Sequence, residues 1–213
     1  MSRNTIRTGR GRPPILVVLA GLIVLAGCAT LSGLAALREV AFDLDRVSEV
    51  RIAGINVENK RSWSDLSAYD VARLGVAVLA KDVPLEAVVH VRGENPQSNE
   101  VDARLTEMEW ELFLEDRKTL EGRLDQDYVF PPGTPVDIPI RVRTDLADVF
   151  SDGSANDLFN LALALADQGG EPVEVRLDAR PTIETSLGRI RYPSTITLRK
   201  MVGGTAGAPG GSR

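Results

Sequence analysis

The stretch VPLEAVVHV, residues 83–91, decides the fold class because its side chains alternate along the chain. Its odd-numbered residues are all apolar and share one face of an extended chain, whereas Glu86 and His90 lie on the other face. This period of two is typical of a β-strand with one buried and one solvated side. We therefore predict a sheet strand here, with His90 on its wet face.

The same alternation continues on the C-terminal side of this stretch. Over residues 101–114 the inward parity changes near Thr106–Glu107, which predicts a β-bulge at that point. Polar residues 115–118 predict a turn, residues 119–124 a returning strand, and Pro131–Thr134 a second turn. The strand over 136–142 contains Pro139, which cannot donate to a sheet ladder, so we predict an edge strand or a local break.

Two segments have helical spacing instead. Residues 64–74 predict a helix with Ser64 as its N-cap, although residues 75–79 fit a strand equally well. Asn156–Asp157 before the Ala/Leu-rich residues 158–166 predicts a second capped helix that ends before Gly169–Gly170. The aromatic residues near these helices are expected in the core; they are Trp63, Tyr69 and Phe159.

Alternation resumes at residue 173 and runs through two last strands over 183–198. Short strands separated by turn signals predict a mainly β fold, an antiparallel immunoglobulin- or fibronectin-like β-sandwich with one or two helices. We place this domain at residues 50–200, after a tether or first strand at 28–49. The Gly-rich tail, residues 201–213, is expected to be disordered.

The N-terminus has the layout of a secretory signal peptide over residues 1–27. Four arginines and no acidic residue precede an apolar run over 15–26. That run is too short for a transmembrane helix, which needs about 20 apolar residues. We therefore expect export of the chain.

The only cysteine, Cys28, directly follows Leu25-Ala26-Gly27. This run resembles the bacterial lipobox, and the resemblance implies that Cys28 is diacylated and becomes the first residue of the mature lipoprotein. The alternative is an uncleaved membrane anchor with an inert cysteine. The resemblance further implies outer-membrane sorting, at its periplasmic face in a cell with two membranes, because Ala29 stands where an aspartate would favour the inner membrane.

Charge and composition narrow the range of partners. From Cys28 onward the chain has 21 basic and 30 acidic residues, a net charge of −9. Because affinity for nucleic acid comes from clustered Lys and Arg, nucleic acid is excluded as a partner. We expect contact with the membrane through the lipid alone, contact with envelope proteins whose identity is open, and no small-molecule substrate or cofactor other than the covalent lipid.

Candidate catalytic and metal-binding residues are few. His90 is the only histidine, so it would have to be the base of any Ser-His-Asp triad, and no second histidine exists for a zinc site. Its position on a wet strand face favours a plain surface residue, and we expect no enzyme and no metal site. A carboxylate row on one strand face is either a surface for cations or basic partners or, as we favour, a solvated sheet face; it comprises Glu107, Glu109 and Glu111.

A second acidic cluster precedes the later helix. Its oxygen-bearing residues are Asp145, Asp148, Asp152, Ser154, Asn156 and Asp157. They could bind calcium, but the spacing is not that of an EF-hand loop. We favour helix capping and a polar loop.

Four features of the chain occur together in a known family. They are a strand over 88–94 that ends in Asn95-Pro96, a following strand from 101, Gly122, and the Gly188-Arg189-Ile190 stretch. In these features the chain resembles the late embryogenesis abundant (LEA) type 2 family, with its WHy-domain branch. Gln97 stands where that family has Asn, and the loop over 62–81 is longer than in the family. The resemblance implies an immunoglobulin-like sandwich, no catalytic site, and roles in water stress and in binding macromolecules. Taken alone, Asn95-Pro96 is expected to end a strand and start a tight connection.

Together these features predict a non-catalytic, lipid-anchored cell-envelope protein. The first functional hypothesis is a stress-protective module that binds or shields other molecules during desiccation or osmotic stress. The alternative is an adaptor in an envelope assembly or transport complex. An adaptor should expose a contiguous apolar patch or an open strand edge, whereas a shield should be uniformly polar.

Overall fold

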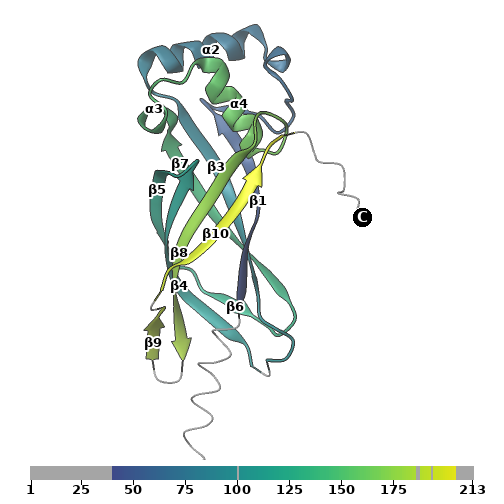
Figure 1. The fold of residues 1–213 in the computed structure, drawn as a ribbon, viewed down its shortest axis with the longest axis vertical. Coiled ribbons are helices and arrows are strands. Elements are labelled where there is room, and N and C mark those ends of the chain that lie inside the picture. Colours follow the sequence, from purple (N-terminus) through teal and green to yellow (C-terminus); the bar gives the residue numbers. More distant parts are fainter. Residues whose placement is uncertain (1–39, 100, 186–187, 193, 205–213) are drawn as a thin grey trace, which may run out of the picture.

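Two antiparallel β-sheets pack face to face, and short helices close one end of the sandwich (Figure 1). The structure is a computed structural model that describes residues 40–99, 101–185, 188–192 and 194–204. The predicted mainly β, antiparallel sandwich is confirmed.

The first sheet has four strands in the order β2-β1-β3-β7. Their bounds are β1 Ala41–Ile52, β2 Ile55–Asn56, β3 Pro84–Glu94 and β7 Pro135–Asp145. Ala41 pairs with Glu94 and Ile52 with Leu85, so β1 and β3 run side by side over their whole lengths.

The second sheet has the main order β10-β8-β4-β5, with β6 paired to β4 and β9 paired to β8. Its strands are β4 Ala103–Leu114, β5 Arg117–Leu124, β6 Tyr128–Phe130, β8 Val173–Thr185, β9 Gly188–Arg191 and β10 Ile196–Val202. β4 and β8 form the centre of this sheet.

Four short helical segments lie at the end of the sandwich where β3 begins and β7 ends (Figure 1). They are η1 Trp63–Asp65, α2 Ala68–Ala80, α3 Leu146–Val149 and α4 Ala155–Leu165. α4 is apolar on most sides and contributes buried residues to the core, including Phe159 and Leu163. It therefore closes the open end of the two sheets.

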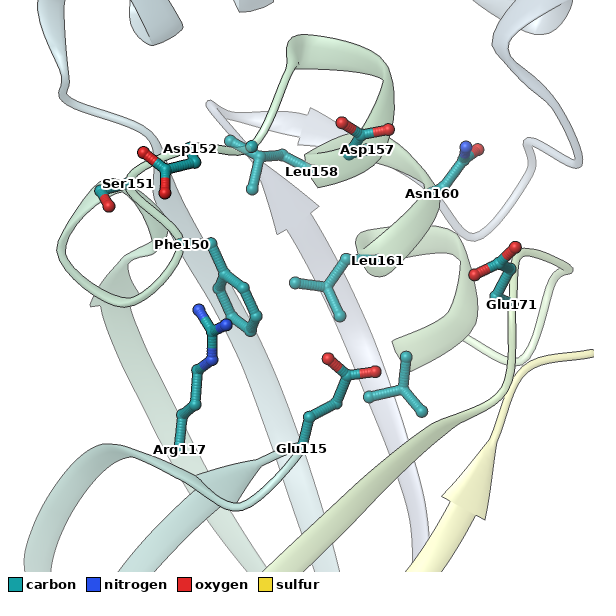
Figure 2. Close-up of a pocket in the computed structure, with 12 residues that line it drawn as sticks. Glu115, Arg117, Phe150, Ser151, Asp152, Asp157, Leu158, Asn160, Leu161 and Glu171 are labelled. Atoms are coloured by element: carbon teal, nitrogen blue, oxygen red, sulfur yellow. The ribbon is translucent and has the colours of Figure 1, made fainter.

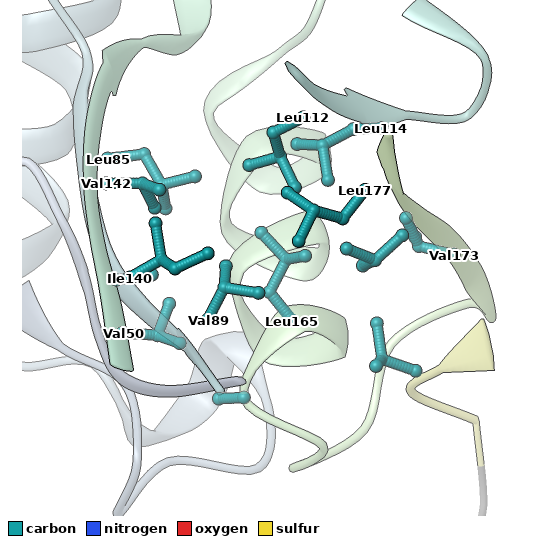
Figure 3. Packing of buried hydrophobic residues seen from close by; sticks show 14 of the residues in the cluster. Val50, Leu85, Val89, Leu112, Leu114, Ile140, Val142, Leu165, Val173 and Leu177 are labelled. Carbon is teal, nitrogen blue, oxygen red and sulfur yellow. The ribbon is translucent and has the colours of Figure 1, made fainter. Parts of the chain in front are cut away.

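The core forms where the inner faces of the two sheets meet. Figure 3 shows Val89 and Ile140 of the first sheet facing Leu112 and Leu177 of the second, with Leu165 of α4 among them. All five side chains are buried. The four strand residues belong to segments whose alternation predicted an inward face.

Several local predictions are confirmed. The stretch at 83–91 forms β3, and the predicted bulge appears as a register shift between Leu105 and Glu107 in the pairing of β4 with β8. β7 lies at the edge of its sheet, as Pro139 predicted.

Both helix starts differ from the prediction. α2 is capped by Ser67 rather than Ser64, and residues 75–79 are helical rather than extended. α4 is capped by Ser154 rather than by Asn156–Asp157. In both cases the serine hydroxyl accepts a bond from the amide of an aspartate three residues later, and that carboxylate accepts from the serine amide, so each cap is a capping box.

The core assignment of the aromatic residues is right for Phe159 and wrong for Tyr69. Phe159 is fully buried and meets the half-buried Trp63 edge to face, with ring centroids 5.7 Å apart. Tyr69 is 73% exposed because it lies on the side of α2 opposite to Leu74, the buried residue of that helix. The sheets also extend beyond residues 50–200, because β1 begins at Ala41 and β10 ends at Val202.

Candidate functional site

The outer side of α2 carries an apolar surface that we call the α2 face, formed by Tyr69, Ala72, Val76 and Leu79. Successive members are three or four residues apart, which places them on one side of a helix. Val76 is 66% exposed and Leu79 is 87% exposed. The other large apolar side chains exposed in the described part are Val101, Val129 and Met201, and they lie on other elements. The α2 face is therefore the main exposed apolar cluster of the described chain.

The α2 face and the point where the chain enters the sandwich lie at opposite ends of the molecule (Figure 1). β3 leaves α2 and runs the length of the sheet, and Ala41 at the start of β1 pairs with Glu94 at the far end of β3. The first residue of β1 thus lies a full strand length from α2.

A cleft of about 440 Å³ opens beside α4 (Figure 2). Arg117 reaches into it, where it donates to the Val149 carbonyl oxygen at 3.0 Å and lies over the Phe150 ring, 5.0 Å from its centroid. Glu115 and Glu171 add carboxylates to the lining. Because the guanidinium already bonds within the chain, the arrangement fits structural closure of this end better than ligand binding.

The acidic cluster near this cleft is used largely for helix capping. Asp145 accepts hydrogen bonds from the Val83 and Ala147 amides, both at 2.9 Å, and so caps α3. Ser154 and Asp157 form the capping box of α4. The Ser154 hydroxyl and then the Ser154 amide, bonded to the carboxylate, lower the pKa of Asp157 below its ordinary value. Asp148, Asp152 and Asn156 are exposed.

Metal-binding groups and membrane-spanning helices were sought in the part of the chain that the structure describes. No three side chains among its His, Cys, Asp and Glu residues lie close enough together to hold a metal ion. None of its helices is long and apolar enough to cross a bilayer.

The carboxylate row on β4 is paired with basic side chains of the same sheet. Glu107 pairs with Arg123 of β5, and Glu109 pairs with Arg191 of β9. Glu111 accepts from Lys118 at 2.8 Å, and Lys118 also bonds Glu121. The hydrogen bonds that Lys118 donates to the Glu111 and Glu121 carboxylates raise the pKa of Lys118, so its charged form is favoured. The row is thus part of an ion-paired sheet face.

The prediction for His90 is wrong, because the side chain is buried rather than wet: the residue is only 8% exposed. Its Nε2 lies 2.8 Å from the Ser48 hydroxyl oxygen, and its Nδ1 lies 2.8 Å from a carboxylate oxygen of Asp137. These neighbours come from β1 and β7, the two strands that flank β3. Sequence reasoning missed both partners, which lie 42 and 47 residues away along the chain.

Asn95 is fully buried where β3 ends. Its side-chain amide donates to the carbonyl oxygens of Val101, at 3.0 Å, and Phe130, at 2.9 Å. The backbone carbonyl oxygen of Asn95 accepts a hydrogen bond from the Gly133 amide at 2.7 Å. With Pro96 next to it, Asn95 links the β3–β4 and β6–β7 connections at the end of the sandwich where β1 begins. The lipobox residues Leu25, Ala26, Gly27 and Cys28, together with Ala29, lie outside the described residues.

No protein-family model and no curated protein matches the chain. Among solved structures, the chain resembles a protein from Archaeoglobus fulgidus, at 12% identity over 75% of this chain and 98% of the other, with a TM-score of 0.35. It also resembles a candidate LEA protein, at 16% identity over 89% of this chain and 86% of the other, with a TM-score of 0.39. A third likeness is to an Arabidopsis thaliana protein, at 16% identity over 56% and 70% of the two chains, with a TM-score of 0.34. Identity and TM-score are low in all three cases, so the fold assignment rests on the strand pairing of this chain itself.

Proposed function

We propose that this chain is a lipid-anchored cell-envelope protein of the LEA type 2 kind that protects other proteins during desiccation or osmotic stress. In this proposal Cys28 carries the lipid, and the α2 face binds apolar segments that client proteins expose when they partly unfold. The observation that carries the proposal is the exposure of Val76 and Leu79 on a capped, ordered helix. Apolar side chains at this exposure, gathered on one face, are typical of an interaction site.

The position and surroundings of the α2 face support a protein client rather than the chain's own membrane. Cys28 precedes β1 in the chain, and β1 begins at the end of the sandwich opposite to α2 (Figure 1). The outer face of the second sheet is occupied by ion pairs such as those of Glu107, Glu109 and Glu111. These polar faces and the net charge of −9 from Cys28 onward favour solubility of a complex whose other partner is apolar.

The test uses the full-length lipoprotein in liposomes, mixed with an enzyme that aggregates on drying, such as lactate dehydrogenase. Recovered enzyme activity and light scattering are measured after drying and rehydration. Leu79→Asp is compared with Met201→Asp, which places the same charge at an apolar residue of β10 that is 58% exposed. Protection should be lost in Leu79→Asp and kept in Met201→Asp. Equal protection by both variants would overturn the α2 face as the binding site.

A second candidate function is an adaptor in an envelope assembly, and the spacing of the α2 face favours it. Intervals of three, four and three residues from Tyr69 to Leu79 match the seam by which one helix packs along another. A photo-crosslinking amino acid at position 79 in living cells separates the two functions, with Cys28→Ser as the unanchored control. One abundant partner, recovered only with the anchor, supports the adaptor, whereas a diffuse set of clients supports protection.

A further inference from the structure

We propose that Ser48 is a nucleophilic serine, activated by His90 and positioned through Asp137, that accepts the acyl group of an anionic ester. The three side chains form one chain of hydrogen bonds across β1, β3 and β7. This site lies on the outer face of the four-stranded sheet, away from the α2 face, so it is independent of the proposed binding role. The proposal assigns the chain a catalytic activity, whereas we expected no enzyme from the sequence.

The order of atoms in this chain is the order that activation of a serine requires. An Asp137 carboxylate can only accept, so His90 donates from Nδ1, and in the neutral imidazole Nε2 is then the acceptor that faces the Ser48 hydroxyl. Burial of His90 holds the ring in place, while Ser48 is half-buried and keeps one side open to solvent. The nucleophile, the base and the group that orients the base are therefore within direct hydrogen-bond reach of one another.

A bulge in β1 changes the backbone directly after Ser48. The pairing of β1 with β3 shifts register between Ser48 and Arg51, and Glu49 within the shift has a φ of 55°. The other non-glycine residues with positive φ in the described chain lie in turns or helix caps. Bulges and left-handed residues inside strands are concentrated next to functional sites, where they redirect a side chain or an amide.

The amide freed by this bulge already holds an anionic oxygen. The Glu49 amide donates to a carboxylate oxygen of Glu58. In serine hydrolases the amide of the residue after the nucleophile is one of the donors that stabilise the oxyanion of the tetrahedral intermediate. We therefore assign the Glu49 amide this role, with the Glu58 carboxylate moving aside when an acyl group enters.

A depression of about 370 Å³ adjoins Ser48 and gives the substrate its charge. Val88, the pairing partner of Ser48, lines it together with Arg51, Arg141 and Arg143 and with the carboxylates of Glu49 and Glu86, so the lining keeps a net positive charge. Arg143 pairs with Glu86 at 2.9 Å. Within the described residues, neither Arg51 nor Arg141 lies within ion-pair distance of a carboxylate, so both are available to a ligand. A carboxylic ester whose acyl chain carries a negative charge fits this depression.

The reaction is an acyl transfer to Ser48 and then to water. The Ser48 oxygen attacks the ester carbon and its proton passes to His90 Nε2; the bond to the alcohol breaks, and the alcohol leaves with that proton. Water then attacks the acyl-serine, gives its proton to His90, and releases the acid, after which the proton returns to Ser48. Asp137 keeps its charge throughout and stabilises the transient imidazolium. Arg46, 3.7 Å from Asp137, also faces this carboxylate.

The charge of Asp137 also affects the side chain of Tyr128 on β6. Burial first, and then the negative charge of Asp137, raise the pKa of Tyr128 above its ordinary value. Tyr128 thus keeps its proton near neutrality.

The first experiment labels the full-length protein in detergent with a fluorophosphonate probe and locates the adduct by peptide mass spectrometry. Ser48 should be modified, and the exposed Ser98 on the same molecule serves as the internal control. Ser48→Ala should abolish the label, and Asp137→Asn should slow labelling by about 100-fold with the circular dichroism spectrum unchanged. If Ser48 reacts no faster than Ser98, the proposal is overturned and the Ser48-His90-Asp137 chain is only a tie between strands.

The second experiment tests the charge of the substrate. Hydrolysis of a p-nitrophenyl ester with a carboxylate at the end of its acyl chain is compared with that of the neutral ester of equal length. Wild type should prefer the anionic ester, and the double variant Arg51→Gln/Arg141→Gln should lose this preference. A wild-type protein that shows no preference would overturn the assignment of the depression.

Discussion

Trp110 lies across Gly122 on the neighbouring strand, so closely that a Cβ atom on Gly122 would come within 2.3 Å of the indole Cζ2. The two residues are direct partners in the pairing of β4 with β5. The indole packs into the space that a side chain at position 122 would fill. This contact explains a glycine in the middle of β5, where glycine otherwise weakens a strand.

Gly122→Ala is therefore expected to destabilise the domain by about 1–3 kcal/mol, because the indole must leave its position. Urea denaturation followed by tryptophan fluorescence measures the change. Gly75→Ala is the matched control, since nothing lies within 4 Å of a Cβ at that position of α2. It should instead stabilise by about 0.5–1 kcal/mol through helix propensity. Destabilisation by both variants would show that the Trp110 contact is not the cause.

Asn95→Ala should lower stability more than an ordinary surface change. It removes the amide that bonds the Val101 and Phe130 carbonyl oxygens, and it leaves the Phe130 oxygen without that donor at a buried position. The expected cost is about 1–3 kcal/mol for an unsatisfied buried group. Asn59→Ala, at an exposed position, should change the free energy of unfolding by less than about 0.5 kcal/mol. Equal midpoints for the two variants would contradict this role.

The capping box of α4 gives a pH dependence with a definite sign. Its hydrogen bonds lower the folded-state pKa of Asp157 below the ordinary value of 3.8. The stabilisation is therefore fully present above about pH 3.8 and is lost as the pH falls through the lowered folded-state pKa. Asp157→Asn should have a lower Tm than wild type at pH 7, and the two Tm values should converge in strong acid. Asp152→Asn, at an exposed loop residue, should follow wild type at both pH values.

Cys28→Ser tests the anchor that the sequence predicts. Wild type expressed in a bacterial host should incorporate radiolabelled palmitate and enter the detergent phase in Triton X-114 partitioning. The variant should do neither. Palmitate incorporation that survives the substitution would refute the lipobox interpretation.

The sequence predicted those strands whose alternation is uninterrupted. The inward residues of β3 and β7 recur at every second position, and those such as Val89 and Ile140 are buried as predicted. β1 was expected only as a tether or first strand because it has two register shifts against β3. Each shift changes the face to which the following residues point, so Leu44, Val47 and Val50 show no single period.

Local signals could not choose between neighbouring serines as helix caps. Ser64 and Ser67 are both suitable N-caps, and the choice of Ser67 follows from Asp70, which completes a capping box three residues later. The same pattern, Ser154 with Asp157, was legible in the sequence at α4. Searching for the pair rather than for a single cap residue would have placed both helix starts.

The environment of His90 could not be predicted because it depends on register between distant segments. Polar residues on a strand face predict that the face is exposed to solvent. Here, however, Ser48 and Asp137 from the flanking strands cover the imidazole of His90. Only the observed pairing of β3 with β1 and β7 brings these residues together.

The prolines in β7 have a consequence for crowding at a membrane. The lipid anchoring proposed above would confine many copies to two dimensions, where open strand edges meet often and tend to join into extended sheets. β7 presents an edge in which Pro135 and Pro139 have no amide hydrogen to offer. At the other sheet, β5 and β10 carry Lys118 and Lys200 along their edges. The sandwich can thus be packed densely on a lipid surface and still resist fibre formation.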